Sequence, residues 1–335
     1  MNSTDTPSLN TTATSLRNHA HRSVQSIAQT TFDDQVAFYA DAARSLATRR
    51  AYASDMAAYS TWGGRIPASP EMVASYLAAS DSLAASTLRR RLAAIADAHQ
   101  TVGRPDPTKH PLVRKVFRGI CRVHGARTDA ATPLDIDMLA RIIGSLPNDL
   151  TAIRDRALLL VGFFCALRRS ELVALAVEDL DRRPDGWIIA IPRSKTDPYG
   201  RGQYVQLPTF KGPLCPTAAV GSWLAIAAIA EGRVFRAVGL HHKIASTLPA
   251  PRVGSILRQR AAEAGLDVQR LSAHSLRSGF AVSATRAGIG AAQIQTVTRH
   301  RTLSGLAPYV RTAGPPSAAQ LLGLPSLNAP ALGEP

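Results

Sequence analysis

Residues Leu271–Arg311 read LSAHSLRSGFAVSATRAGIGAAQIQTVTRHRTLSGLAPYVR, and the rest of the chain is organised around this stretch. His274 and Arg277 are three positions apart, so that on a helix their side chains share one face. His300 follows, and Tyr309 lies nine positions after it, across an expected turn. Two imidazoles, a guanidinium and a phenol in one segment make a poor core but suit a phosphate site. Tyrosine ordinarily has a pKa of about 10, but cationic neighbours and a bound phosphodiester can make it an oxygen nucleophile.

A second motif lies upstream, at the end of an apolar run: Phe163-Phe-Cys-Ala-Leu-Arg168-Arg-Ser-Glu171-Leu. Together with the motifs His-Ser-Leu-Arg, Arg-His and Tyr-Val-Arg of the first stretch, it resembles the signature of tyrosine recombinases, the phage integrase superfamily that includes Cre. The family's upstream box reads G-L-R-x-S-E-L, so Ala166 stands where Gly is usual. An H-x-x-R motif alone occurs by chance, but the ordered set is specific. The resemblance covers residues 30–312 and is strongest in the second half.

The resemblance implies cleavage of a DNA phosphodiester. Its transition state gathers negative charge on the non-bridging oxygens, which Arg168 and Arg277 would neutralise while His300 donates a further hydrogen bond. Tyr309 would attack the phosphorus and become a 3′-phosphotyrosine. Because that bond stores the energy for rejoining and the arginines supply the charge, the resemblance implies no metal, no ATP and no other cofactor.

Proton transfer in this scheme falls to two other residues. His274 would take the phenol's proton or orient it, and Lys195 would protonate the leaving 5′-oxygen. Lys195 lies in an expected β-hairpin around residues 192–200 and is one of only five lysines among the 39 basic residues, which argues against its being filler. The catalytic set implied by the resemblance is Arg168, Lys195, His274, Arg277, His300 and Tyr309, with Glu171 supporting Arg168.

The sequence departs from the family's usual pattern near two of these residues. Arg299 stands where the family often has Gly before His300, and Ser278-Gly279 replaces a common His-Thr or His-Ser pair. We expect neither position to supply an essential group. Taken singly, a histidine or a tyrosine is more often a core or surface side chain than a catalytic one, so only the ordered set favours a site.

The 335 residues carry 39 Lys and Arg against 24 Asp and Glu, a net charge of +15. The excess is shared, with 16 basic and 10 acidic residues in 1–130 and 23 and 14 in 131–335. This balance is typical of proteins that bind polyanions, so the expected partner is double-stranded DNA. Three widely spaced cysteines form neither a disulfide framework nor a zinc pattern. Since the chain shows no signal peptide and no run of about 18 apolar residues, we expect a cytoplasmic protein without membrane contact, nucleoid-associated when bound to DNA.

We expect a mainly α-helical chain with a small antiparallel β-sheet, forming a C-shaped clamp on DNA. Residues 1–30 are rich in Ser, Thr and Asn and are expected to be a disordered arm. Residues 31–124 show helical periodicity and resemble the family's core-binding domain, a SAM-like bundle. Residues 125–132 are the expected linker, and residues 133–314 the α+β catalytic domain. Residues 315–335 hold a short apolar helix and a tail. In the family such a helix docks on a neighbouring protomer, and packing on its own domain is the open alternative.

Basic residues recur in three groups on the expected helices of the first domain. Helix starts there are marked by signals such as Ser69-Pro70, an N-cap followed by Pro at the first helical position. A solvated helix face explains any one basic group, but three groups in one small bundle favour a DNA-binding surface. Arg can make bidentate contacts to phosphate or guanine. The DNA-binding candidates are Arg49, Arg50, Arg89, Arg90, Arg91, Lys115, Arg118 and Arg122.

In the catalytic domain, the apolar residues 149–167 predict a buried helix that delivers Arg168 from the core. Ser170 is placed to N-cap the next short helix. Alternating and β-branched residues predict strands at 177–181, 187–192 and 203–207, which would form a small antiparallel sheet.

Other function classes stay open at this point. The same residues would serve a type IB topoisomerase-like enzyme that nicks and closes DNA, or remain in a DNA-binding regulator with a decayed site. A two-metal nuclease is disfavoured, because Asp179, Asp181 and Asp185 lack a matching partner. The pair His241-His242 lacks a third metal ligand. For a recombinase we expect a homo-oligomer, a dimer on each DNA site and a tetramer at synapsis.

Overall fold

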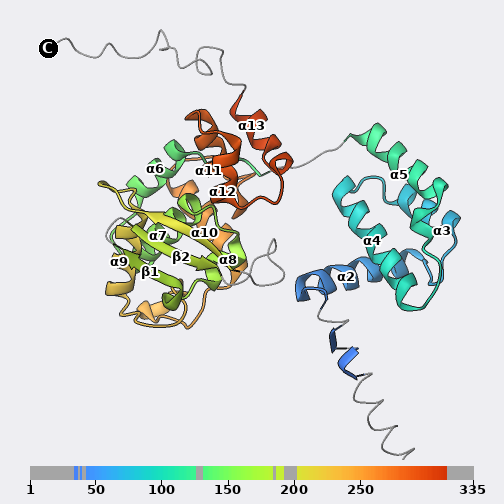
Figure 1. The fold of residues 1–335 in the computed structure, drawn as a ribbon, viewed down its shortest axis with the longest axis horizontal. Helices are drawn as coiled ribbons and strands as arrows, with labels where there is room; N and C mark the ends of the chain where they lie inside the picture. The colour runs from blue at the N-terminus through green and yellow to red at the C-terminus, as the bar shows by residue number, and fades with distance from the viewer. Residues whose placement is uncertain are drawn as a thin grey trace, which may run out of the picture. The chain divides into compact units, whose positions relative to one another are not determined.

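The computed structural model describes residues 34–36, 38–39, 43–125, 131–183, 186–191 and 202–314. The chain divides into two compact units, Met1–Thr128 and Asp129–Pro335, each with its own hydrophobic core (Figure 1). The expected arm, most of the expected linker and the expected C-terminal helix lie outside the described residues, so these parts of the domain scheme stay predictions. No helix in the described ranges is long and apolar enough to cross a membrane.

The first unit is a helical bundle. Its core is aromatic at one end, where the rings of Tyr59 and Tyr76 meet edge to face with centroids 4.9 Å apart. The helix starts follow the sequence signals: Ser69 accepts a hydrogen bond from the Met72 N–H, and Pro70 takes the first position. Its elements are α2 (Leu46–Trp62), α3 (Pro70–Ala79), α4 (Ala85–Thr101), the short 3-10 helix η1 (Pro107–Lys109) and α5 (Pro111–His124).

The second unit is built of helices around a small sheet, so the predicted fold class is confirmed. Most of its helices are amphipathic or buried and meet over one continuous core. Its helices are α6 (Ile136–Ser145), α7 (Leu150–Phe164), α8 (Arg169–Ala174), α9 (Pro216–Ile226), α10 (Ala250–Glu263), α11 (His274–Arg286), α12 (Ala291–Thr298) and α13 (Ala307–Ala313). The 3-10 helices are η2 (Val177–Asp179), η3 (Leu240–His242) and η4 (Leu303–Gly305).

The sheet has three antiparallel strands in the order β1 (Leu180–Arg183), β2 (Gly186–Ile191) and β3 (Gln203–Pro208). Its register pairs Ile189 with Leu180 on one side and with Val205 on the other. Ile189 and Val205 are buried, so one face of the sheet packs on the core. The first predicted strand was placed too early, because residues 177–179 form η2 instead of extended backbone.

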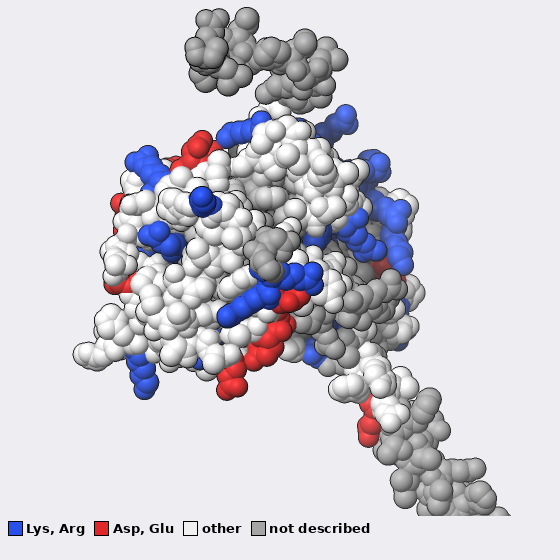
Figure 2. Space-filling view, turned by 60° about the vertical axis from the view of Figure 1, so that its left-hand side comes forward, with Lys and Arg blue, Asp and Glu red and all other residues white. Residues whose placement is uncertain are grey.

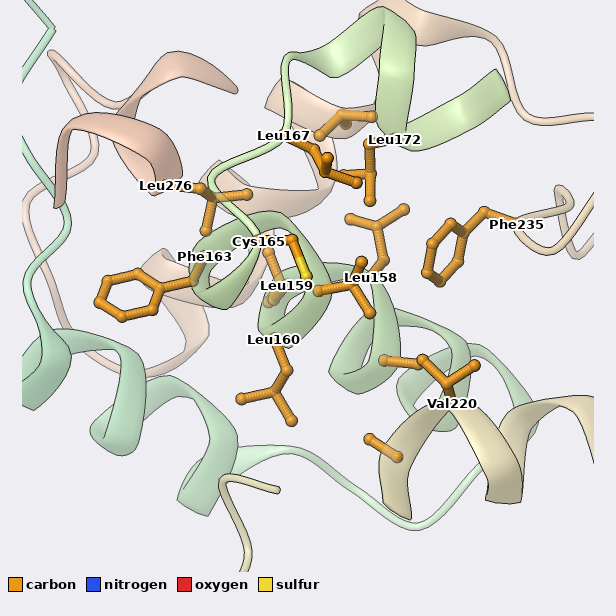
Figure 3. Close-up of a cluster of buried hydrophobic side chains, with 14 of the residues drawn as sticks. Leu158, Leu159, Leu160, Phe163, Cys165, Leu167, Leu172, Val220, Phe235 and Leu276 are labelled. Carbon is orange, nitrogen blue, oxygen red and sulfur yellow. The ribbon is translucent and has the colours of Figure 1, made fainter. Parts of the chain in front are cut away.

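Helix α7 is the centre of the second unit. It is buried on nearly all sides and packs against α9 and α11. Figure 3 shows Leu158 directed toward Phe235 and Val220, and Phe163 directed to the opposite side of the helix. A helix held on several faces is a rigid support, so the segment that leaves it carries the next side chains to fixed positions.

Helix α8 begins differently from the prediction. Arg168 is the N-cap residue, and its backbone N–H donates to the Glu171 carboxylate at 2.9 Å. Ser170 is therefore inside the helix and is not its cap. In a capping box, the side chain of the third helical residue accepts the backbone N–H of the N-cap residue, and Glu171 does this for Arg168.

Candidate active site

The site forms where α11, α13 and the start of α8 converge. Tyr309 on α13 lies against His274 at the start of α11, with the phenol oxygen 2.8 Å from the imidazole Nε2. Helix α13 packs on α11, and Tyr309 rests on a small apolar cluster of Ala281, Ile294 and Leu306. The nucleophile candidate is thus held by its own chain, 35 positions after its partner.

Burial controls the protonation of this pair. Burial raises the pKa of Tyr309, and the charge of Arg277 offsets this only in part. Burial, followed by the charges of Arg277 and Arg168, lowers the pKa of His274. The cationic surroundings alone therefore do not ionise the phenol. At neutral pH a protonated phenol faces a neutral imidazole, which is the arrangement that general-base catalysis requires.

Arg277 is almost wholly buried, with 2% of its surface exposed. One arm, Nη1, donates to the Ala166 carbonyl at 2.6 Å. The other, Nη2, is buried and has no hydrogen-bond partner among the described residues. Burial and the charges of Arg168 and Arg299 lower the pKa of Arg277 to about 10, so it stays charged at neutral pH. A buried charged donor without a protein acceptor suits an anionic ligand.

The turn that presents this carbonyl is strained. Ala166 has a φ of 44°, in the left-handed region that Gly adopts without a steric penalty. This φ explains why the family usually has Gly at this position. The strained backbone aims the Ala166 carbonyl at Arg277 and carries the chain from α7 into Arg168.

Glu171 binds Arg168 twice. Besides the cap bond, its Oε1 accepts from Arg168 Nη1 at 2.7 Å. Burial alone would raise the pKa of Glu171, but the N–H of Arg168 and the charges of Arg299 and Arg168 outweigh it and lower that pKa. The carboxylate therefore stays ionised and holds Arg168, whose side chain keeps 21% exposure. Arg169, the other arginine of the motif, is exposed.

Arg299 is a site residue that the sequence analysis set aside. Its guanidinium is buried and donates from Nη2 to Glu171 Oε2 at 2.7 Å, across 128 positions of sequence. The residue ends α12 with a φ of 54°, again at a position where Gly is usual. The available signal was the departure from Gly itself, because a side chain retained at a left-handed position needs a compensating contact.

His300 is oriented by Thr298. The imidazole Nδ1 lies 2.8 Å from the Thr298 hydroxyl, which donates its only hydrogen to the Ile294 carbonyl. Nδ1 must therefore carry a hydrogen and donate it, so that Nε2 of the neutral ring is an acceptor. Burial and the charges of Arg277 and Arg168 lower the pKa of His300 to about 4. The His300 ring lies 5.8 Å from the Tyr309 ring, measured between centroids.

The net charge of this cluster is positive. The guanidinium groups of Arg168, Arg277 and Arg299 surround one carboxylate, that of Glu171, so three positive charges minus one leave +2. A neutral phenol and two neutral imidazoles complete the set. Such a site can hold a tetrahedral oxyanion beside a hydroxyl nucleophile and its base. Lys195 lies outside the described residues, so its distance from the cluster is not part of this geometry.

The basic groups of the first unit differ in their surroundings. Arg90 makes a bidentate pair with the buried Asp55, at 2.7 and 2.9 Å. Arg91 turns onto the Tyr76 hydroxyl at 2.8 Å. Arg91 is half-buried by this contact, whereas Arg90 keeps 49% of its side chain exposed beside Asp55, and both stay predicted DNA-binding candidates. Besides Arg90, exposed side chains are found at Arg50, Arg89, Lys115, Arg118 and Arg122. For the second unit, which the view of Figure 2 brings to the front, the picture shows Lys and Arg side chains spread over the face in view.

Two of the acidic residues weighed for a nuclease have ordinary structural contacts, and Asp185 lies outside the described residues. Asp179 accepts the Ala176 N–H at 2.9 Å, and Asp181 pairs with Arg183. In the described parts of the chain, no three His, Cys, Asp or Glu side chains gather in a way that could hold a metal ion. The pair His241-His242 belongs to η3.

Comparison with known proteins agrees with this geometry. The chain matches the family model described as phage integrase family over residues 132–314. It is 34% identical over 275 residues to the integrase/recombinase XerD homolog of Selenomonas ruminantium, covering 78% of this chain and 81% of that protein. Two solved structures share its fold. The Tn1549 transposon integrase in complex with transposon right end DNA has a TM-score of 0.59 at 12% identity, over 84% of this chain and 93% of that one. A lambda integrase dimer bound to a core site has a TM-score of 0.58 at 15% identity, over 86% and 97%.

Proposed function

This chain belongs to the phage integrase family, the tyrosine recombinases, and from that premise we propose that it cleaves and rejoins duplex DNA at a specific site. Enzymes of this family transfer DNA strands. For this chain we further propose that the reaction passes through a 3′-phosphotyrosyl intermediate formed on Tyr309 and uses neither metal nor ATP. The observation that best supports it is the contact of 2.8 Å between the Tyr309 hydroxyl and His274, beside the buried, unpartnered Nη2 of Arg277.

In the cleavage step the Tyr309 oxygen attacks the phosphorus and its proton passes to His274 Nε2. The bond between phosphorus and the 5′-oxygen breaks, and that oxygen takes a proton from Lys195, whose part rests on the resemblance alone. Arg168 and Arg277 bind the non-bridging oxygens as their charge grows. In rejoining, a 5′-hydroxyl attacks the phosphotyrosine and releases the phenol, so the bond energy is conserved and no nucleotide is consumed.

In this scheme His300 takes part as the imidazolium and not as the neutral ring. Because Nδ1–H is held by Thr298, the neutral ring can offer a phosphate oxygen only a lone pair from Nε2. A hydrogen bond to phosphate therefore requires the imidazolium form. A bound phosphate places negative charge beside the ring and raises its pKa, so substrate binding itself favours the second proton.

The wider assembly is proposed on the same premise. The first unit would grip DNA through its exposed basic helix faces, and the two units would close on the duplex as a clamp. The relatives support a DNA partner, since the Tn1549 and lambda integrases were both solved on DNA. Synapsis would join four copies, two on each site, with the segment beyond residue 314 as the candidate bridge between them.

The test is to trap the covalent complex and sequence the attached DNA. Wild-type protein, incubated with a pool of nicked suicide duplexes, should yield a denaturant-resistant adduct through Tyr309 that selects one sequence. Tyr309→Phe should bind the selected DNA within about twofold of wild type and form no adduct, because it lacks only the attacking oxygen. Adduct on the Phe variant would mean that another residue is the nucleophile.

The same experiment separates the alternatives. Relaxation of a plasmid that lacks the selected sequence would favour a topoisomerase-like nicking and closing activity. Sequence-selective binding by wild-type protein with no adduct at any pH would favour a DNA-binding regulator. Strand exchange between two labelled duplexes that carry the selected sequence would establish recombination.

A further inference from the structure

Arg299 occupies a position that its backbone disfavours. Its φ of 54° lies in the left-handed region, where a side chain is strained and Gly is not. The side chain is nevertheless retained and buried, with 8% of the residue exposed. Burying a guanidinium is unfavourable unless it is paired and hydrogen-bonded. The contacts that the Arg299 guanidinium makes must therefore offset both the backbone strain and the cost of burying its charge.

Its partners are the carboxylate of Glu171 and backbone carbonyls. Nη2 donates to Glu171 Oε2 at 2.7 Å, and Nη1 donates to the Cys165 and Val297 carbonyls at 3.3 and 3.1 Å. Oε2 of the same carboxylate accepts the Arg168 N–H, and Oε1 accepts Arg168 Nη1. Glu171 thus binds two guanidinium groups, and Arg299 joins the end of α12 to Glu171 in the first turn of α8.

This arrangement changes the charge that Arg168 can offer. Arg168 and Glu171 alone would be a neutral pair, one positive charge against one negative. With Arg299 the three side chains carry +1. Arg299 adds a second donor to Oε2, beside the Arg168 N–H, while Arg168 Nη1 binds Oε1, so that both carboxylate oxygens are held and Arg168 is kept in one orientation.

We propose that Arg299 is a positioning residue: acting through Glu171, it aims Arg168 at the scissile phosphate and restores the positive charge that Glu171 would otherwise cancel. The proposal rests on the proposed function, since the phosphate it concerns is the one attacked by Tyr309. Arg299 itself contacts no reacting atom in this scheme. Its effect should appear in the rate of cleavage and not in the affinity for DNA.

The main test compares Arg299→Gly with wild-type protein in single-turnover cleavage of the selected suicide duplex. Gly removes the guanidinium and relieves the left-handed strain, so thermal unfolding reports whether the unit stays folded. We expect adduct formation to slow at least about tenfold while the Kd for DNA changes less than about threefold. Arg299→Lys keeps the charge but loses the fork, and should recover part of the rate. Arg252→Ala, which removes an exposed arginine from α10, is the charge-matched control and should cleave like wild type.

A double-variant comparison shows whether the effect passes through Glu171. Glu171→Gln should slow cleavage by itself, and adding Arg299→Gly to it should cost less than about twofold more. Independent, multiplied losses would overturn the proposal, because a residue that merely stabilises the fold would act without Glu171. A Gly variant that is folded and cleaves within twofold of wild type would also overturn it.

Inorganic phosphate separates this proposal from the recombinase assignment. Titrated into the full chain and followed through the His300 ring signals, phosphate should bind about tenfold more weakly to the Gly variant than to wild-type protein. If wild-type protein forms no adduct on any DNA but the Gly variant loses phosphate affinity, the recombinase proposal falls and the positioning role stands. If phosphate affinity and cleavage are both unchanged, Arg299 positions nothing.

Discussion

Arg277 donates one arm to the Ala166 carbonyl and keeps the other buried, so its orientation is set before substrate arrives. A charge held in place needs no reorganisation as the transition state forms. We therefore expect Arg277→Ala and Arg168→Ala each to slow cleavage by about 10² to 10³-fold, with DNA affinity nearly unchanged. Single-turnover adduct formation and gel-shift titration measure the two quantities separately.

Arg169→Ala is the matched control for this prediction. Arg169 is the next residue in the chain and the first of α8, but its side chain is exposed. Removing it should alter cleavage less than about threefold. If the Arg168 and Arg277 variants lost binding and cleavage in equal proportion, they would be backbone contacts and not part of the reaction centre.

The half-buried imidazole of His300 predicts how stability changes with pH. Its folded-state pKa of about 4 lies below the ordinary value near 6.5, so between these values the unfolded chain binds the extra proton. The free energy of unfolding should therefore rise as pH increases from about 4 to 6.5 and level off above. Thermal unfolding of His300→Gln should show a shallower rise between pH 5 and 6.5. Equal slopes for the variant and the wild type would mean that the folded protein does not hold the His300 ring in its neutral form.

Residue contacts divide into those the sequence could predict and those it could not. The spacing of motifs predicted that His274 and Tyr309 belong together, and the structure places them in hydrogen-bond contact. It could not predict Arg299, because that contact crosses 128 positions and depends on a left-handed turn. Nor could the sequence predict the role of Thr298. It orients His300 because its one hydroxyl hydrogen is donated to the Ile294 carbonyl.

At the scale of elements, α11 carries His274 and Arg277, and its seating depends on Gly279. A Cβ at that glycine would lie 1.7 Å from the Leu134 carbonyl oxygen, which is backbone and cannot move aside. The Leu134 N–H also donates to the Ser275 carbonyl, tying the segment before α6 to α11. We expect Gly279→Ala to lower the free energy of unfolding by about 3 kcal/mol, measured by denaturant titration, and to slow cleavage by shifting α11.

Gly144 offers the opposite case on α6. Nothing lies within 4 Å of a Cβ built there, so Gly144→Ala should leave the fold unchanged and add about 0.5 to 1 kcal/mol of stability. If the two variants were equally stable, the close approach of α11 to Leu134 would be wrong. Gly279 departs from the family's usual residue, and its packing against Leu134 gives the physical reason for the glycine.

Elements themselves were easier to predict than their ends. The apolar run that became α7 and the Ser69-Pro70 start of α3 are decided by local pattern, so the sequence predicted them. The predicted start of α8 was wrong. The helix begins two residues earlier, with Arg168 as its N-cap, because the Glu171 carboxylate reaches back and accepts the Arg168 N–H. Residues 177–179 form η2, where the carboxylate of Asp179 binds the Ala176 N–H and turns the chain.

At the scale of the whole molecule, the positive charge is divided between two units with separate cores. Residues 1–130 hold 16 basic against 10 acidic residues, an excess of 6, and residues 131–335 hold 23 against 14, an excess of 9. If both units contact the DNA backbone, both release counterions on binding. The dependence of DNA affinity on salt concentration should then reflect the phosphate contacts of both units.

The fragment Asp129–Pro335 tests this division. It keeps the whole core of the second unit and should still form the Tyr309 adduct, but it lacks the exposed candidates Arg50, Arg89, Lys115, Arg118 and Arg122. Each phosphate contact adds about 0.9 to the slope of log K against log salt, so the fragment's slope should be shallower than the full chain's by up to roughly 4 to 5. Gel-shift titrations of both proteins on the selected duplex, at several salt concentrations, measure the difference. Equal slopes would mean that the first unit makes no phosphate contacts, and the clamp would then have to be abandoned while the Tyr309 site stood unaffected.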